Sequence, residues 1–235
     1  MRLFIIRHAD PDYPNNTITP DGHLEAKALA KRLAKLGLDR IYCSPLGRAR
    51  DTMQYTADAL GMQATILDWT QELSSLTFKN TLPWPNTCAW DIPGEVILNQ
   101  QPLPTQQDWH TLSHLENLHA KETFEDLIQH SDDFLKTLGF ERQGSRYRVL
   151  NPNVEKVALF CHGGFGLTWL AHLLQIPLTI MWSSFWLSPT SVTTILFDQR
   201  SLEWATPRCL GLGDTSHLYE AGLPIKPRGI KANFE

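Results

Sequence analysis

The chain has 235 residues, of which 42% are hydrophobic and 20% are charged, and its formal net charge at pH 7 is −4. These values describe an ordinary globular protein that can bury a substantial core, so we expect one domain over residues 1–235 rather than a disordered or fibrous chain. The slight negative charge gives no reason to expect a nucleic acid or an anionic membrane as partner.

The four cysteines lie far apart in the sequence and show no CxxC spacing: Cys43, Cys88, Cys161 and Cys209. This distribution argues against a zinc ribbon, a thioredoxin-like motif or a disulfide scaffold. The opening sequence MRLFIIRHAD lacks the long apolar core of a secretory signal, and no stretch approaches the ~20 apolar residues of a membrane span. We therefore expect a cytoplasmic protein with reduced thiols.

Short apolar runs alternate with amphipathic stretches at the start of the chain. Three runs predict strands: residues 3–6, 41–43 and 64–67. The continuous apolar run of residues 3–6 is typical of a strand that is buried on both faces of a parallel sheet. Two helices are expected between the three strands, and each opens with a hydroxyl residue followed by proline, which suits an N-cap and a first helical position. The first helix follows Thr19-Pro20 and ends at Gly37, and the second follows Ser44-Pro45.

The middle of the chain, residues 75–120, has a different character. It shows few charges and no clear period, and it contains Pro83, Pro85, Pro93, Pro102, Pro104, Trp84, Trp90 and Trp109. An irregular stretch of this length in a compact domain is typically a functional insertion, so we expect a lid over the active site. The tryptophans either line a substrate pocket or fill the core of the insertion, and the core is the default expectation.

Regular patterns resume after residue 120. They predict a helix over residues 124–138, a strand over 157–161 and a helix that runs on to Leu174. Residues 191–197 alternate in β-branched side chains and can pair with residues 202–206, whereas the tail from Leu210 is expected to wrap the surface. The pattern is α/β, and we expect a mostly parallel central sheet with helices on both faces.

Unusual residues stand at three of the predicted strand-to-helix junctions: Arg7, His8, Arg48 and His162. Ligands of an open parallel sheet bind beyond the carboxyl ends of its strands, so these side chains can reach one crevice. Arginine offers a planar fork of donors to phosphate oxygens, and helix N-termini add backbone N–H groups. The two arginines should also lower the pKa of a nearby histidine, which keeps the imidazole neutral and nucleophilic.

Four segments around these residues resemble the signatures of the histidine phosphatase superfamily, also called the phosphoglycerate mutase-like family. They stand in the family's order across residues 1 to about 200: Arg7-His8-Ala9, Thr19-Pro20-Asp21-Gly22, Ser44 to Thr52, and Cys161-His162-Gly163-Gly164. The resemblance implies the family's α/β fold. It also implies that His8 is the nucleophile that becomes phosphohistidine, and that Arg7, Arg48 and His162 form the phosphate pocket.

The resemblance further implies a proton donor, which in this family is an acidic residue soon after the third strand. Glu72 is the best match, and Asp68 and Glu95 are the next candidates. This acid would protonate the leaving oxygen and then help water to attack the phosphohistidine. We expect no metal and no cofactor, because the arginines and the histidine supply the positive charge.

Other patterns invite different functions. His8 and Asp10 have the H-x-D spacing of a metal site, which Asp12 and His162 could extend, but the fixed cation of Arg7 disfavours a metal there. The spacing of His110, His114 and His119 suggests a zinc site, but no HExxH motif accompanies these histidines. The HGG segment is also found in lipases, but the chain has no G-x-S-x-G elbow.

The sequence therefore predicts a phosphomonoester hydrolase that acts on a small phosphorylated metabolite through a phosphohistidine. Phosphate or sulfate can be expected to occupy the same site. Two alternatives stay open: a phosphoglycerate mutase-type phosphotransferase, which needs the same residues, and a catalytically silent binder of phosphorylated ligands. The presence of both His8 and a candidate acid disfavours the silent binder, and the substrate itself cannot be read from the sequence.

Overall fold

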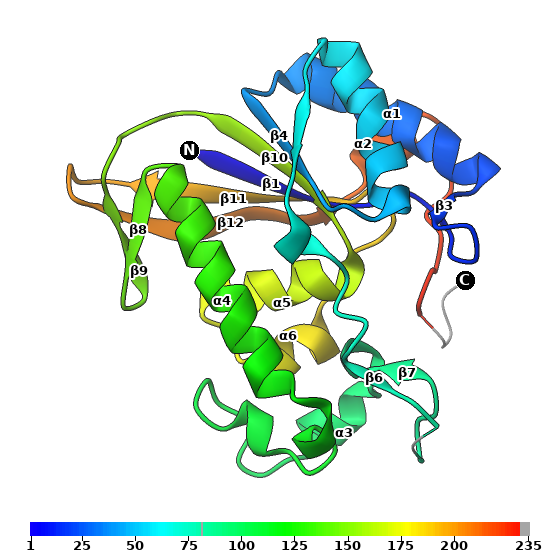
Figure 1. The fold of residues 1–235 in the computed structure, drawn as a ribbon, viewed down its shortest axis with the longest axis vertical. Helices are drawn as coiled ribbons and strands as arrows, with labels where there is room; N and C mark the ends of the chain where they lie inside the picture. The colour runs from blue at the N-terminus through cyan, green and yellow to red at the C-terminus, as the bar shows by residue number, and fades with distance from the viewer. Residues whose placement is uncertain (81, 231–235) are drawn as a thin grey trace.

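An eight-stranded sheet lies at the centre of the computed structural model, which describes residues 1–80 and 82–230 (Figure 1). The strand order is β5-β4-β10-β1-β11-β12-β9-β8. The parallel half holds β5 (Ala64–Ile66), β4 (Arg40–Cys43), β10 (Lys156–Cys161) and β1 (Arg2–Arg7). The antiparallel half holds β11 (Val192–Gln199), β12 (Trp204–Asp214), β9 (Arg146–Val149) and β8 (Phe140–Gln143).

Helices cover both faces of this sheet (Figure 1). One face carries α1 (Pro20–Leu36) and α2 (Gly47–Leu60), and the other carries α4 (Ala120–Thr137), α5 (Gly163–Leu174) and α6 (Leu178–Ser184). Phe4 and Ile6 of β1 pack in the core on the side of α1 and α2, whereas Leu3 and Ile5 pack in the core on the side of α4, α5 and α6. Because both faces of β1 are buried, its sequence is a continuous apolar run. The predicted α/β fold is confirmed.

Helix α1 begins and ends where the sequence predicts. The Thr19 Oγ1 accepts a hydrogen bond from the Gly22 N–H at 3.0 Å, and Pro20 is the first helical residue. Gly37 ends the helix with a positive φ of 69°. The Thr19 hydroxyl also donates to Asp10 Oδ2 at 2.7 Å, so the start of α1 is tied to the loop that follows β1.

Helix α2 begins later than predicted, because Ser44 does not cap it. Leu46 takes the cap position without a side-chain hydrogen bond, and the helix starts at Gly47. The Ser44 hydroxyl is instead 2.7 Å from His162 Nε2, in a neighbouring strand-to-helix junction. The Ser44 hydroxyl, which the sequence predicts as a helix cap, is thus hydrogen-bonded to His162, 118 residues away.

The C-terminal part of the chain holds more regular structure than predicted. Strands β11 and β12 pair antiparallel, as expected for residues 191–206, but β12 continues to Asp214. The prediction of a surface tail from Leu210 is therefore wrong for residues 210–214, which complete a long ladder with β11. A short helix α7 (Ser216–Glu220) follows. The remaining described tail returns to the end of β1, as the hydrogen bonds below show.

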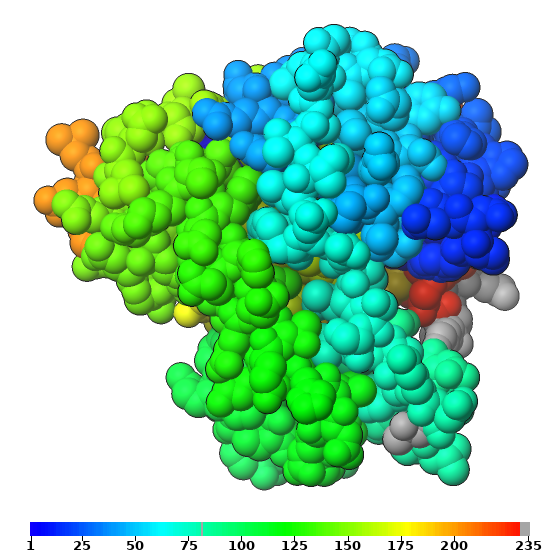
Figure 2. Space-filling view, in the orientation of Figure 1, coloured from blue at the N-terminus to red at the C-terminus, as the bar shows by residue number. Residues whose placement is uncertain are grey.

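The insertion packs at the far end of α4, on the side of the molecule away from α1 and α2 (Figures 1 and 2). It contains two short strands, β6 (Thr77–Phe78) and β7 (Thr87–Cys88), and the short helix α3 (Gly94–Leu98). Trp109 is 2% exposed and belongs to the core, as expected by default. Trp84 lies against Phe78 and His114 inside the insertion, whereas Trp90 lines a cavity at the sheet.

In the described part of the chain, no helix has both the length and the apolar character needed to cross a membrane.

Candidate active site

His8 lies immediately after β1, and its ring is held by its own neighbour. The His8 Nδ1 is 2.7 Å from the Ala9 carbonyl oxygen, which can only accept, so Nδ1 carries the proton and Nε2 keeps its lone pair. Burial lowers the pKa of His8 well below its usual value, and the Arg7 guanidinium lowers the pKa further. The imidazole is therefore neutral, with Nε2 available as a nucleophile.

Arg48 faces this nitrogen from the first turn of α2. Its Nε–H donates to His8 Nε2 at 3.3 Å, and its terminal Nη1 donates to Asn16 Oδ1 at 3.2 Å. The loop around Asn16 approaches so closely that a Cβ on Gly47 would lie 2.0 Å from the Asn16 carbonyl oxygen. Glycine before Arg48 thus lets the loop between β1 and α1 close against the arginine.

Arg7, the last residue of β1, is fixed by carbonyl groups from the C-terminal half of the chain. Its Nη1 donates to the Leu187 carbonyl at 2.5 Å, and both terminal nitrogens lie 3.4 Å from the Arg228 carbonyl. The guanidinium also lies over the Trp186 ring at 5.2 Å. Its Nε is buried and has no hydrogen-bond partner among the described residues.

His162 lies between β10 and α5, as the N-cap residue of α5, and its ring centroid lies 5.2 Å from that of His8. The Ser44 oxygen accepts the Leu46 N–H at 3.4 Å, so the Ser44 hydroxyl can donate to His162 Nε2. The other nitrogen, Nδ1, then carries the proton; it is buried without a partner in the described structure. Burial lowers the pKa of His162 well below its usual value, and His8, Arg48 and Arg7 add to this effect.

Glu72 reaches the same place from the loop after β5, and it occupies the N-terminus of α5. Its carboxylate accepts the Phe165 N–H at 2.8 Å, the Gly164 N–H at 3.2 Å and the N–H of its own neighbour Leu73 at 3.1 Å. Burial raises the pKa of Glu72, and the three hydrogen bonds hold the pKa back. The fallback candidates, Asp68 and Glu95, are exposed and do not line the cavity.

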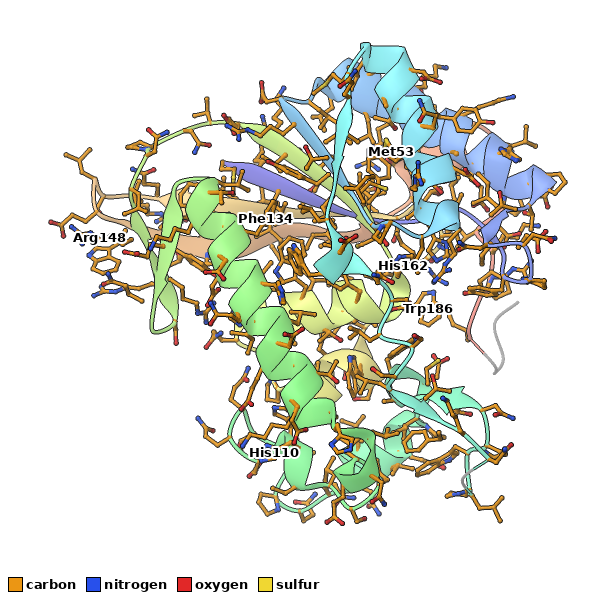
Figure 3. The ribbon with its side chains drawn as sticks, in the orientation of Figure 1. Met53, His110, Phe134, Arg148, His162 and Trp186 are labelled. Atoms are coloured by element: carbon orange, nitrogen blue, oxygen red, sulfur yellow. The ribbon has the colours of Figure 1, made fainter. Side chains whose placement is uncertain are left out.

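A cavity of about 160 Å³ is bordered by three of these groups, Arg7, Arg48 and Glu72. It is lined by Arg7, Tyr13, Arg48, Glu72, Cys88, Trp90, Asp91, Gly163, Leu167, Trp186 and Leu187. Figure 3 shows the labelled His162 and Trp186 near the end of the sheet where α5 begins, with His110 far away in the insertion. A Cβ on Gly164 would lie 2.5 Å from the Trp90 ring, so this glycine admits the indole rather than an anion. Of the five residues predicted for the site, Arg7, Arg48 and Glu72 line the cavity. His8 lies against Arg48, and His162 lies against His8, so all five are neighbours.

The structure adds residues that the sequence analysis did not assign to the site. The Thr52 hydroxyl accepts the Ala9 N–H at 2.9 Å, and Glu25 Oε2 accepts the Asp10 N–H at 2.8 Å. Arg228 forms an ion pair with the buried Asp10. Thr52 is the last residue of the Ser44 to Thr52 segment, so the sequence resemblance pointed to its neighbourhood. No local pattern marks Arg228, which is 218 residues from its partner Asp10.

Among residues 1–80 and 82–230, no group of three or more histidine, cysteine, aspartate or glutamate side chains is placed to hold a metal ion. Asp10 turns away from His8, toward Thr19 and Arg228.

Comparison with known proteins places this geometry in a family context. Residues 3–83 match the model of the histidine phosphatase superfamily (branch 1). A protein of Hydrogenobacter thermophilus named "Putative phosphoserine phosphatase 2" is 31% identical over 121 residues, 45% of this chain and 58% of the relative. A "Probable phosphatase" of Schizosaccharomyces pombe is 36% identical over 62 residues, 23% of this chain and 30% of the relative. The chain thus spans less than two thirds of either relative.

Solved structures match over nearly the whole chain. Phosphoserine phosphatase from Entamoeba histolytica, in complex with 3-phosphoglyceric acid, has a TM-score of 0.60 and 19% identity, with 92% of this chain and 98% of that chain covered. A mycobacterial glucosyl-3-phosphoglycerate phosphatase has a TM-score of 0.58 and 17% identity, with 90% and 98% covered. At these identities the likeness shows the fold.

The chain has the α/β fold of these phosphoglycerate mutase-like neighbours. The resemblance to the histidine phosphatase superfamily is confirmed, because the family model covers the segments that contain His8, Thr19 and Arg48.

Proposed function

We propose that the protein is a metal-independent phosphomonoester hydrolase that acts on a small phosphorylated metabolite through a phosphohistidine. The observation that carries the proposal is the His8 Nε2 lone pair, which faces Arg48 at 3.3 Å beside the cavity that Glu72 lines. The phosphatase names of the relatives and of the structural neighbours support it. The arginines provide the positive charge that a phosphoryl group requires.

In the first step, Arg7, Arg48 and the Nδ1–H of His162 bind the oxygens of the phosphoryl group. His8 Nε2 attacks phosphorus in line with the ester oxygen, so a P–N bond forms as the P–O bond breaks. The proton of Glu72 passes to the leaving oxygen, and the alcohol departs neutral. The raised pKa of Glu72 suits this role, because the group must be protonated when it meets the substrate.

In the second step, the Glu72 carboxylate takes a proton from water while the water oxygen attacks phosphorus. The P–N bond breaks, and inorganic phosphate and neutral His8 result. The three N–H groups around Glu72 stabilise its carboxylate form, whereas burial favours its acid form. This balance allows one residue to serve as acid and then as base.

We also propose that residues 75–120 act as a lid within a single domain of residues 1–235. The support is that three residues of the insertion, Cys88, Trp90 and Asp91, line the cavity, and that Trp90 rests on the first turn of α5. A lid of this kind excludes water while the phosphoryl group is transferred.

The test is turnover and trapping with His8→Ala and with His130→Ala as a control for an exposed histidine outside the site. His8→Ala should abolish phosphate release, and Arg48→Ala should slow it about 10²–10³-fold. Wild-type protein quenched without acid should carry phosphate on His8, and the His130 variant should match it. Full turnover by His8→Ala would refute the mechanism, and isomerisation of a substrate without phosphate release would favour the mutase. Binding of substrate with neither reaction would favour the silent binder.

A further inference from the structure

Trp90 connects the insertion to the first turn of α5. The residue lies in a short 3₁₀ turn (Ala89–Asp91), and its half-buried ring packs against Gly164. A Cβ on Gly164 would lie 2.5 to 2.7 Å from three ring atoms, Cε2, Cδ2 and Cε3, so the face of the six-membered ring rests on the Gly164 backbone. Glycine is required at this position because a side chain would occupy the place of the ring.

Glu72 is hydrogen-bonded to the same turn of α5. Its Oε2 accepts the Gly164 N–H at 3.2 Å. Its Oε1 accepts two shorter bonds, from the Phe165 N–H at 2.8 Å and from the Leu73 N–H at 3.1 Å. Two N–H donors favour a bare acceptor, so Oε2 is the oxygen better suited to carry the proton. The residue under the Trp90 ring therefore binds the oxygen from which the proposed general acid would donate.

The backbone also links Trp90 to the loop of Glu72. The Ala89 N–H donates to the Leu76 carbonyl at 2.8 Å, and the Leu76 N–H donates to the Leu73 carbonyl at 2.9 Å. Trp90 is thus tied through its neighbour to the loop that carries Glu72, and through its ring to the helix that binds the carboxyl group. Since the ring and Glu72 border one cavity, removal of the ring would open the first turn of α5 to water beside the acid.

We propose that Trp90 is a positioning residue for the acid: its ring holds the first turn of α5 in place and excludes water from Glu72 Oε2. The inference rests on the proposed phosphatase function, and it gives the insertion a part in proton donation in addition to covering the cavity. Because Trp90 acts through the proton donor, its loss should slow esters whose leaving alkoxide must be protonated. It should spare esters whose leaving group departs as an anion.

The test compares benzyl phosphate with p-nitrophenyl phosphate, two esters of similar shape. Benzyl alcohol is a much weaker acid than p-nitrophenol, so benzyl phosphate depends strongly on the general acid and p-nitrophenyl phosphate hardly does. Trp90→Ala should lower kcat/KM roughly ten- to a hundredfold for benzyl phosphate and about threefold or less for p-nitrophenyl phosphate, since small displacements of a catalytic group are costly. Trp84→Ala is the control, because this indole contacts Phe78 and His114 inside the insertion, and it should leave the ratio of the two rates unchanged.

The pH profile separates this role from a purely structural one. Burial raises the pKa of Glu72, so water that enters in Trp90→Ala should lower this pKa and move the alkaline limb of kcat/KM for benzyl phosphate to lower pH. The substitution leaves in place the other charged and titratable groups near Glu72, which include Arg7, Arg48, Asp91 and Cys161. Trp90→Phe keeps an aromatic face over Gly164 and should restore most of the wild-type ratio.

Gly164→Ala tests the contact without altering Trp90. The added methyl group takes the place of the ring, and a second cavity of about 410 Å³ that Trp90 also borders gives the ring room to move. Gly164→Ala should show the same selective loss with benzyl phosphate, and adding Trp90→Ala should cause little further loss, because both changes remove one contact. Equal losses on the two esters, or an unshifted alkaline limb, would overturn the inference while turnover of p-nitrophenyl phosphate still supports the proposed function. Wild-type protein that hydrolyses neither ester would contradict the proposed function, and this inference with it.

Discussion

At the scale of single residues, burial shifts the pKa values of two groups in the site in opposite directions. Burial lowers the pKa of His8, so the nucleophile is neutral over the whole physiological range. Burial raises the pKa of Glu72, so the acid keeps its proton to a higher pH than a solvated glutamate does. Pairs of groups shifted apart in this way are typical of acid–base chemistry near neutral pH.

The pH dependence of turnover follows from these directions. In the proposed mechanism the active form has Glu72 protonated and His8 neutral, so kcat/KM for an alkyl ester should fall as the pH rises through the raised pKa of Glu72. Glu72→Gln should remove this alkaline limb and slow the hydrolysis of alkyl phosphates about 10²–10⁴-fold. It should slow p-nitrophenyl phosphate much less, because an aryl oxide leaves without a proton. Steady-state pH profiles on both esters measure the effect; equal losses on the two would point to another acid.

At the scale of elements, most strands and helices followed from local patterns. Capping at Thr19 predicted α1 correctly, since the signal and its effect lie within one turn. The same type of signal at Ser44 gave a wrong start for α2, because the Ser44 hydroxyl is hydrogen-bonded to His162 at another junction. The antiparallel extension of β12 also escaped prediction: its outward side chains are exposed and its sequence carries glycine, so its pairing depends on β11 rather than on its own pattern.

Helix α1 also carries Glu25, whose buried carboxyl group binds the loop that follows His8. Glu25 is 2% exposed, accepts the Asp10 N–H and has its other oxygen unpartnered in the described structure. Burial raises the pKa of Glu25 to about 7 from a usual 4.5. The folded protein therefore holds this proton more tightly than the unfolded chain does. Stability is lost as the pH rises from about 4.5 through about 7.

Glu25→Gln should remove this pH-dependent loss. Wild type should lose about 3 kcal/mol more unfolding free energy than the variant between pH 4.5 and pH 8, since each pKa unit corresponds to about 1.4 kcal/mol. Urea unfolding at the two pH values measures the difference, and the exposed Glu116→Gln serves as the control. Parallel stability curves for wild type and Glu25→Gln would show that Glu25 does not titrate in this range.

At the scale of the whole molecule, the phosphate pocket combines both ends of the chain. Four of the predicted site residues stand at strand-to-helix junctions within recognisable segments, which is why the sequence pointed to Arg7, His8, Arg48 and His162. Glu72 was predicted only from its place soon after the third strand. The groups around them could not be predicted, since Leu187 and Arg228 act through backbone carbonyls that any residue carries. A contact made by a main-chain carbonyl does not depend on the side chain, so the sequence cannot predict it.

Arg228 is expected to position Arg7 by anchoring the tail through Asp10. Arg228→Ala should lower kcat/KM roughly ten- to a hundredfold, because small displacements of a positioning group are costly. Lys226→Ala is the matched control in the same tail, and it should change kcat/KM less than twofold because its partner Asp21 is 60% exposed. Similar losses in the two variants would mean that the tail acts through its net charge, which salt titration of the rate would reveal.

The hydrogen bond from Arg7 to the Arg228 carbonyl has a consequence for biosynthesis. A ribosome that adds about 5–20 residues per second makes His8 roughly 10–45 s before it makes Arg228. Throughout that interval the nascent chain holds the nucleophile without the carbonyl that orients the neighbouring arginine. We therefore expect a chain that stops before residue 228 to lack this support of Arg7.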